Sequence, residues 1–134
     1  MTLKSSIEAI NRFALDRDWD QFHSPKNLAA SISIEASELL EIFQWTNHSR
    51  NEICGDAALL KQVSEEIADV MIYCLRLGST LGLDPILIIN DKIELNRRKY
   101  PILESRGNHK KSSEEIRKTI EESSKKFKAF ENWK

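Results

Sequence analysis

The chain has 134 residues, of which 40% are hydrophobic and 31% charged, and its formal net charge at pH 7 is −1. This balance is typical of a globular domain with its own core, and the near-neutral charge excludes the global positive field that drives duplex nucleic-acid binding. The N-terminal residues contain no apolar segment typical of a signal peptide, and the longest apolar run, residues 86–89, is too short to span a bilayer. We therefore expect a cytoplasmic protein with no membrane or nucleic-acid partner, in which Cys54 and Cys74 are free thiols.

Helical periodicity and capping residues predict five helices, over residues 3–16, 25–45, 56–81, 85–100 and 113–132. Ser24-Pro25 and Asp84-Pro85 each place a capping residue before a proline at the first helical position, and Gly82 stands where the third helix should end. The sequence has no alternating strand pattern of useful length. It therefore predicts an all-α fold, a helical bundle of four core helices plus a C-terminal helix.

The segment from residue 107 onward differs in composition from the rest of the chain. It is rich in Lys, Glu and Ser, its charges are mixed, and Ser112 with Glu115 has the spacing of a capping box. Its sizeable apolar residues are Ile116, Ile120, Phe127, Phe130 and Trp133. We expect one domain over residues 1–106 and a charged amphipathic helix over 107–134 that packs on a neighbour, with partial disorder as the alternative.

Four acidic residues border the apolar stripes of the second and third predicted helices. Glu35 lies inside the second helix's stripe and Glu38 at its edge, while Glu66 and Asp69 form a column with Tyr73 along the edge of the third. The stripes consist of Leu28, Ile32, Leu39, Ile42 and Phe43 in the second helix, and of Val63, Ile67, Val70, Cys74, Leu77 and Leu81 in the third.

A carboxylate on a core-facing stripe is costly to bury unless a cation, hydrogen bonds or protonation compensates it. A hard divalent ion such as Mg²⁺ suits carboxylate oxygens that converge from two packed helices. Each acidic pair alone is also typical of a solvated helix face, but two pairs that both border apolar stripes favour a metal site.

A cationic column follows on the fourth predicted helix. Lys92, Asn96 and Lys99 share one face at helical spacing, and such a column near a metal site would bind the oxygens of a triphosphate. The alternatives are a solvated face stabilised by the helix dipole, and nucleic-acid binding, for which the patch is short and poor in aromatic residues.

Trp19, His23 and Trp45 have two interpretations. Such residues are commonly packing or capping residues, but beside a phosphate site their rings could hold a nucleobase.

These residues lie in segments that resemble the MazG-like, dCTP-pyrophosphatase type of all-α NTP pyrophosphatase. The segments are residues 17–28 (RDWDQFHSPKNL), 35–39 (EASEL), 43–45 (FQW), 66–73 (EIADVMIY) and 92–101 (KIELNRRKYP). The resemblance implies hydrolysis of a nucleoside triphosphate between its α- and β-phosphates, giving the monophosphate and pyrophosphate. It also implies a homo-oligomer, a tetramer of paired dimers or else a dimer, in which neighbouring subunits complete the pockets.

The same resemblance implies roles for individual residues. Glu35, Glu38, Glu66 and Asp69 match catalytic carboxylates that hold Mg²⁺, with Mn²⁺ as the alternative ion, and Glu38 is our candidate for activating the attacking water. Lys92, Asn96 and Lys99, joined by Tyr73, match triphosphate contacts. Trp19, His23 and Trp45 match positions that line the nucleotide pocket.

One departure leaves the preferred base open. Members of the dCTP type carry a His three residues before the Phe that matches Phe13, and this chain has Ile10 there. The substrate is therefore expected to be a (d)NTP, with dCTP or a modified nucleotide as candidates. The alternative function is a non-catalytic nucleotide-binding or regulatory helical oligomer, against which the presence of all four carboxylates argues.

Overall fold

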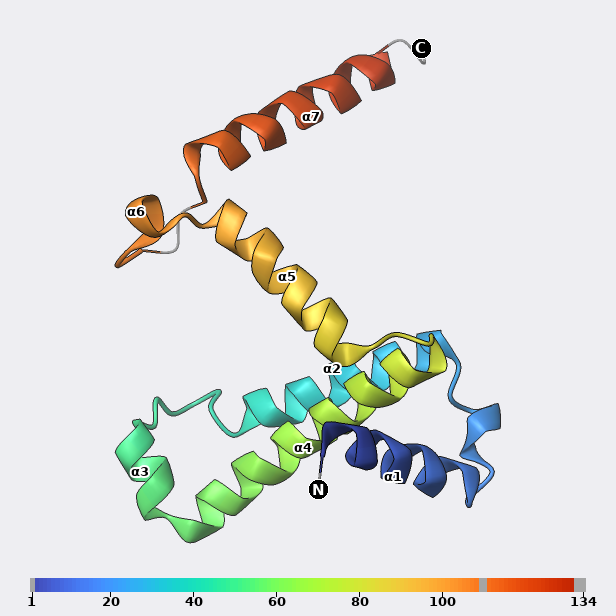
Figure 1. Ribbon diagram of the computed structural model, residues 1–134. Helices are drawn as coiled ribbons and strands as arrows, with labels where there is room; N and C mark the ends of the chain where they lie inside the picture. Colours follow the sequence, from blue (N-terminus) through green and yellow to red (C-terminus); the bar gives the residue numbers. More distant parts are fainter. Residues whose placement is uncertain (1, 109–110, 132–134) are drawn as a thin grey trace. The chain divides into compact units, whose positions relative to one another are not determined.

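The computed structural model describes residues 2–108 and 111–131 (Figure 1). Its elements are α1 (Leu3–Leu15), the 3₁₀ helix η1 (Trp19–Gln21), α2 (Pro25–Glu41), α3 (Arg50–Gly55), α4 (Ala57–Thr80), α5 (Pro85–Lys99), α6 (Ile102–Ser105) and α7 (Ser113–Glu131). No strand occurs in these ranges, which confirms the all-α prediction. Asn132 and Trp133, and the side chains of Phe127 and Phe130, lie outside what the structure describes.

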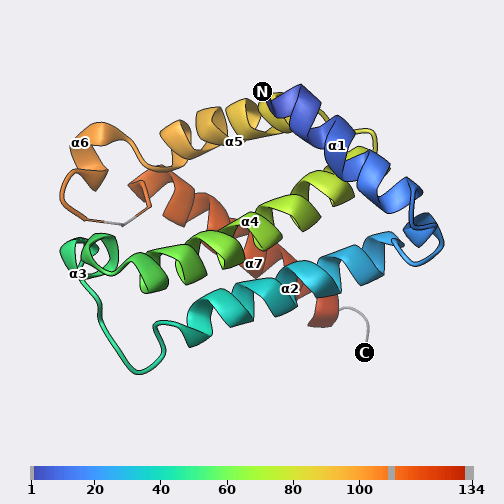
Figure 2. The same ribbon diagram turned by 90° about the horizontal axis from the view of Figure 1, so that it is seen from below.

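The chain divides into two compact units, residues 1–85 and 86–134. In the first unit α2 and α4 run side by side and make the most extensive helix contact, while α1 and α3 each pack on α4 (Figure 2). In the second unit the Ser112 amide donates to the Lys99 carbonyl at 2.9 Å and ties the start of α7 to the end of α5. The boundary expected between residues 106 and 107 stays a prediction.

Local hydrogen bonds account for the main helix ends. The Ser24 hydroxyl accepts from the Asn27 amide, so α2 begins at Pro25 as predicted. Gly82 follows the end of α4 with φ 68°, and the Leu83 amide donates to the Gly78 carbonyl at 2.8 Å. This is the glycine-terminated helix end that the sequence predicted.

Three features differ from the expectations. The structure ends α2 at Glu41, not Trp45, because the following amides donate to carbonyls three residues back, as in the bond from Phe43 to Leu40. The elements η1, α3 and α6 were not predicted, because each is too short to show a periodic pattern. At the start of α7 the Ser112 hydroxyl accepts from the Glu115 amide at 3.1 Å. The reciprocal half of the expected box is replaced by the bond from the Ser112 amide to α5.

The apolar stripe predicted on α2 faces inward: Leu28 is 1% exposed, and its other members are half-buried. The stripe predicted on α4 is only partly correct, since Ile67, Cys74 and Leu81 are exposed. The column of Glu66, Asp69 and Tyr73 is instead half-buried, because helices α1 and α2 cover that edge of α4. The two cysteines are free, as expected.

Within the described residues, no single helix is long and apolar enough to cross a membrane. Only α4 and α5 taken together, across the break between them, reach the required length and composition.

Candidate active site

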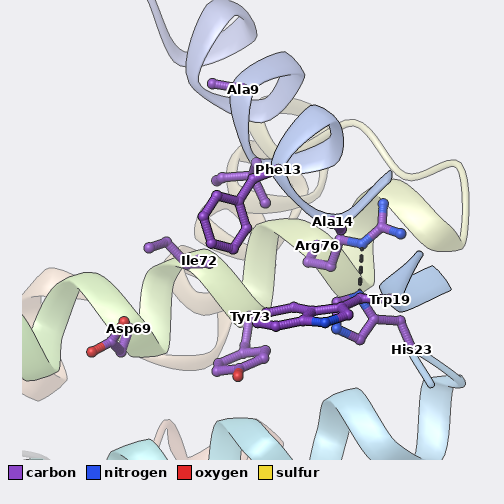
Figure 3. A pocket seen from close by; sticks show the side chains of 10 residues that line it. Ala9, Phe13, Ala14, Trp19, His23, Asp69, Ile72, Tyr73 and Arg76 are labelled. Atoms are coloured by element: carbon purple, nitrogen blue, oxygen red, sulfur yellow. Dashed lines mark hydrogen bonds between the residues drawn. The ribbon is translucent and has the colours of Figure 1, made fainter. Parts of the chain in front are cut away.

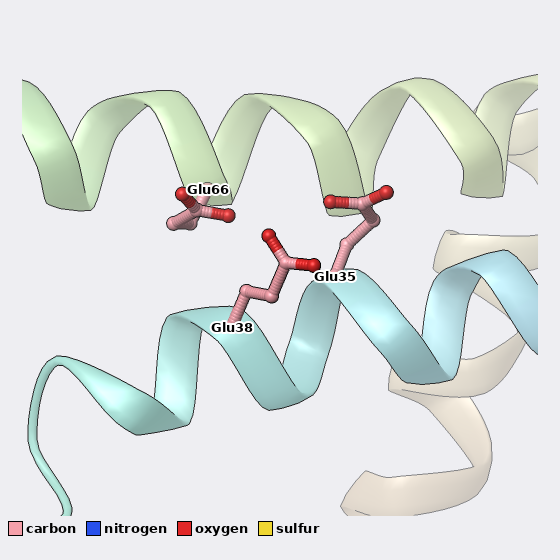
Figure 4. Close-up of side chains that lie close together, drawn as sticks. All are labelled: Glu35, Glu38 and Glu66. Carbon is pink, nitrogen blue, oxygen red and sulfur yellow. The ribbon is translucent and has the colours of Figure 1, made fainter.

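Three of the four predicted carboxylates meet between α2 and α4. Glu35 and Glu38, one turn apart on α2, face Glu66 on α4 (Figure 4). One carboxylate oxygen from each of the three lies within 4.8 Å of the other two. The spacing of three residues on α2 places both side chains on the face that packs against α4, which is why the cluster forms.

The cluster is electrostatically strained. Burial, and then the negative charges of Glu38, Asp69 and Glu66, raise the pKa of Glu35 above its usual range. Burial also raises the pKa of Glu66, with further contributions from Glu38, Asp69 and Glu65. Among the described residues, Glu66 Oε2 is shielded from solvent and accepts no hydrogen bond. A divalent cation would bind the shielded oxygen and neutralise the neighbouring negative charges. The chemistry of these carboxylates therefore fits such an ion.

Asp69, the fourth predicted carboxylate, connects the cluster to a neighbouring cavity. Its charge acts on both Glu35 and Glu66, and its side chain lines a cavity of about 460 Å³ between α1, η1 and α4 (Figure 3). The cavity walls are Ala9, Ile10, Phe13, Ala14, Trp19, His23, Asp69, Ile72, Tyr73 and Arg76. The volume and the mainly apolar walls suit one small aromatic ligand.

The loop between α1 and α2 brings two predicted pocket residues to this cavity. Asp18 adopts the left-handed conformation, with φ 55°, and reverses the chain just before Trp19. The Trp19 ring stands edge-on to the Phe13 ring at 5.7 Å between centroids and to the His23 ring at 6.2 Å. The Asn27 side chain donates to the backbone carbonyl just before His23 and anchors the loop to α2.

Arg76 completes this side of the cavity and was not predicted. Its Nε donates to His23 Nδ1 at 3.2 Å, one terminal nitrogen donates to Asn11 Oδ1 at 2.8 Å, and the other pairs with Asp20. Its side chain is 12% exposed. The signal available in the sequence was its position, three residues beyond Tyr73 in the column that Glu66 and Asp69 begin.

The remaining predicted residues do not line this cavity. Trp45 is 87% exposed beyond the end of α2. Lys92, Asn96 and Lys99 belong to the second unit, where they share a groove of about 350 Å³. The other residues of that groove are Leu95, Arg98, Glu115 and Lys118. The structure thus brings the cationic column together in one groove, and its role in phosphate binding stays a prediction.

The sequence of this chain matches a known protein family and several characterised proteins. The model of the MazG-like family matches residues 30–115. Human dCTP pyrophosphatase 1 is 35% identical over 114 residues, which cover 81% of this chain and 67% of the human protein. The mouse dCTP pyrophosphatase 1 is 38% identical over 124 residues, or 87% of this chain and 72% of the mouse protein.

A solved structure gives the same result. The crystal structure of a pyrophosphatase from Archaeoglobus fulgidus matches with a TM-score of 0.67 and 45% identity, covering 74% of this chain and 92% of that one. These matches confirm the resemblance read from the sequence. The chain belongs to the MazG-like family of all-α nucleoside triphosphate pyrophosphatases.

Proposed function

We propose that this enzyme, a nucleoside triphosphate pyrophosphohydrolase, converts a (d)NTP to the monophosphate and pyrophosphate, with dCTP or a modified nucleotide as its candidate substrate. The observation that carries the proposal is the cluster of Glu35, Glu38 and Glu66, which Asp69 links to a mainly apolar cavity with room for a nucleobase. The relatives named dCTP pyrophosphatase support dCTP as a candidate. Ile10 lines the cavity at the position where the dCTP type carries a His, so the preferred base stays open.

Glu35, Glu38, Glu66 and Asp69 would hold a divalent cation, for which we propose Mg²⁺, with Mn²⁺ as the alternative. A cation bound there supplies positive charge to the triphosphate oxygens and makes a nearby water easier to deprotonate. The shielded Glu66 Oε2 and the mutual repulsion of these carboxylates support this assignment.

Glu38 is the proposed base. It is the exposed member of the cluster, so its carboxylate remains accessible to water while Glu35 and Glu66 are half-buried. The water oxygen forms a bond to the α-phosphorus, the bond from that phosphorus to the bridging oxygen breaks, and pyrophosphate leaves. The proton lost by the water passes to Glu38.

The other predicted residues would bind the two ends of the substrate. Trp19 and His23 line the cavity and would hold the base, while Tyr73 lines the same cavity beside Asp69 and would contact the phosphates. We propose that the groove formed by Lys92, Asn96 and Lys99 binds oxygens of the triphosphate and that Trp45 is a further contact to the base.

We further propose that the protein is a homo-oligomer, a tetramer or else a dimer, that acts in the cytoplasm. Support for an oligomer comes from the described residues of the first unit, where Ala14 and Leu28 are buried while large hydrophobic residues such as Ile67 and Met71 are exposed. Apolar surface of this extent is typical of subunit interfaces.

The direct test is product analysis with each common dNTP and NTP, with Mg²⁺ and then with EDTA. We expect the monophosphate and pyrophosphate only when Mg²⁺ is present. Glu38→Gln should abolish turnover while the helices stay folded, and Glu41→Gln, an exposed residue on the same helix, is the matched control. Full activity in Glu38→Gln would remove its role as base, and turnover in EDTA would remove the metal requirement.

A further inference from the structure

We infer that Arg76 is a positioning residue that fixes the imidazole of His23 in one tautomer, with its proton on Nε2, so that the free nitrogen of His23 donates a hydrogen bond to a base with an acceptor on its edge and accepts none. The inference rests on the proposed function for the identity of the ligand. The tautomer itself is a property of the protein alone.

The hydrogen bond between the two side chains determines which ring nitrogen of His23 carries the proton. A guanidinium can only donate, so the bond from Arg76 Nε to His23 Nδ1 at 3.2 Å requires a lone pair on Nδ1 (Figure 3). In a neutral imidazole the proton then sits on Nε2. A proton on Nδ1 would set two donors against each other.

The Arg76 guanidinium cannot easily rotate away from His23. One terminal nitrogen donates to Asn11 Oδ1 and the other pairs with Asp20. The Asn11 amide is itself oriented, because its Nδ2 donates to Ser79 Oγ at 2.7 Å and leaves Oδ1 for Arg76. Arg76 is thus held from α1, from η1 and from the loop that carries His23, and the planar fork of an arginine is needed to meet all three partners.

The tautomer of His23 limits which ligands the cavity can bind. With Nδ1 occupied, Nε2 is the nitrogen of His23 that can contact a molecule in the cavity, and it can only donate. Trp19 stands edge-on to the His23 ring and Phe13 edge-on to Trp19, so a planar ring has apolar faces to pack against. The site therefore selects a nucleobase that presents a carbonyl oxygen or a ring-nitrogen lone pair to His23. A base whose edge offers only donors there would leave two donors unpaired.

The decisive measurement is nitrogen-15 NMR of the histidine side chains in the substrate-free protein at neutral pH, with His23→Gln used to assign the signal. We expect the Nε2–H tautomer for His23 and a mixture of tautomers in Arg76→Lys, which keeps the charge but loses the fork. An Nδ1–H tautomer or a doubly protonated ring in the wild type would overturn the inference. The wild-type result needs no variant other than His23→Gln, which assigns the signal.

Kinetics separate positioning from simple structural support. Arg76→Lys should raise KM for the best triphosphate by about tenfold, the effect of one misplaced hydrogen bond, and leave kcat within about twofold. A glutamine at position 23 places its amide nitrogen near the original Nε2 and has no tautomers. In the His23→Gln background, Arg76→Lys should therefore change KM by less than about twofold.

An equal rise in KM in both backgrounds would show that Arg76 acts only through the fold, and would overturn the positioning role. Arg12→Lys is the matched control, because Arg12 forms an exposed ion pair with Asp16 on α1. If NMR finds the Nε2–H tautomer and no triphosphate is hydrolysed, the proposed function fails while the tautomer assignment stands.

Discussion

Glu66 keeps one carboxylate oxygen shielded from solvent and without a hydrogen-bond partner among the described residues, beside Glu35, Glu38 and the charge of Asp69. Such an arrangement disfavours the metal-free fold, since burial and like charges raise the pKa of Glu66. A destabilising arrangement of this kind is retained when the same carboxylate oxygen is needed for function. Such a loss of stability in favour of activity is common at catalytic sites.

Glu66→Gln should therefore separate the two effects. We expect turnover to fall by about 100-fold or more, because a ligand to the proposed cation is lost. The melting temperature measured in EDTA should rise, since one of the repelling charges is removed. Calorimetry and the pyrophosphate assay on the same preparation provide both readouts.

Glu65→Gln is the matched control for this variant. Glu65 is exposed, pairs with Lys61 at 3.6 Å, and precedes Glu66 on the same helix. Its replacement should leave turnover unchanged. A Glu66→Gln protein that keeps wild-type activity would contradict the proposed role of the cluster.

At this scale the sequence singled out the residues of the acidic cluster, whose role in metal binding stays a prediction, and it indicated only some of the residues that line the cavity. Glu35 and Glu66 were identifiable because Glu35 lies inside the apolar stripe of its helix and Glu66 at the edge of the stripe on the next, where acidic residues are unusual. Arg76 was not singled out, because its place in the column that Glu66 begins does not reveal its partners His23 and Asn11, which lie 53 and 65 residues away. A residue that is defined by distant partners becomes visible only once the chain is folded.

At the scale of elements, the end of α4 depends on Gly82. Its φ of 68° is costly for any residue with a Cβ, although nothing lies within 4 Å of the place a Cβ would occupy. We expect Gly82→Ala to lower the free energy of unfolding by about 1–2 kcal/mol for purely conformational reasons. Denaturant unfolding curves of the two proteins measure this difference in the free energy of unfolding, provided that both give the same m-value.

Gly55, the last residue of α3, is the matched control. It also has nothing within 4 Å of its would-be Cβ, but its φ is not positive. Gly55→Ala should therefore be neutral or stabilising by about 0.5–1 kcal/mol. Equal destabilisation by both substitutions would show that space, rather than backbone conformation, decides at Gly82.

The short helix α3 depends on a charged cap. Its first turn carries a reciprocal capping box in which the Ser49 amide donates to Glu52 and the Ser49 hydroxyl accepts from the Glu52 amide. Hydrogen bonds from the Ser49 side chain and backbone lower the pKa of Glu52 below its usual range. Since the folded state binds this proton less tightly, the cap stabilises α3 above the usual glutamate pKa and loses that effect as the pH falls through the lowered value.

Glu52→Gln tests the sign of this effect. The wild type should melt higher than the variant at neutral pH, and the difference should shrink as the pH is lowered through and below the usual glutamate range. Melting curves of both proteins across this range measure it. A difference that is independent of pH would show that the charge of Glu52 contributes nothing to the cap.

The long helices were predictable because caps and periodicity agree over many residues, as at Ser24-Pro25 and Gly82. The elements that carry the site loops were not. The 3₁₀ helix η1 arises from the left-handed turn at Asp18, and α3 from the capping box at Ser49, both too local to show a repeating pattern.

At the scale of the whole molecule, each of the two units leaves large apolar side chains exposed. Leu103 on α6 is 98% exposed, and the apolar run of residues 86–89 at the start of α5 is exposed throughout. The helix pattern alone indicated stripes, but which stripes form an internal core and which form an interface depends on how many layers pack together. That information is not contained in the periodicity of a single helix.

The proposed oligomer follows from this surface, and it predicts that stability depends on protein concentration. Burial of the exposed leucines and isoleucines between chains would make folding and association one process, so the melting temperature should rise as the concentration is raised over a hundredfold range. Light scattering after size exclusion should give four times the 15.5 kDa mass of the chain for the tetramer, or twice that mass for the dimer. A single-chain mass together with a melting temperature that does not change on dilution would contradict the oligomer.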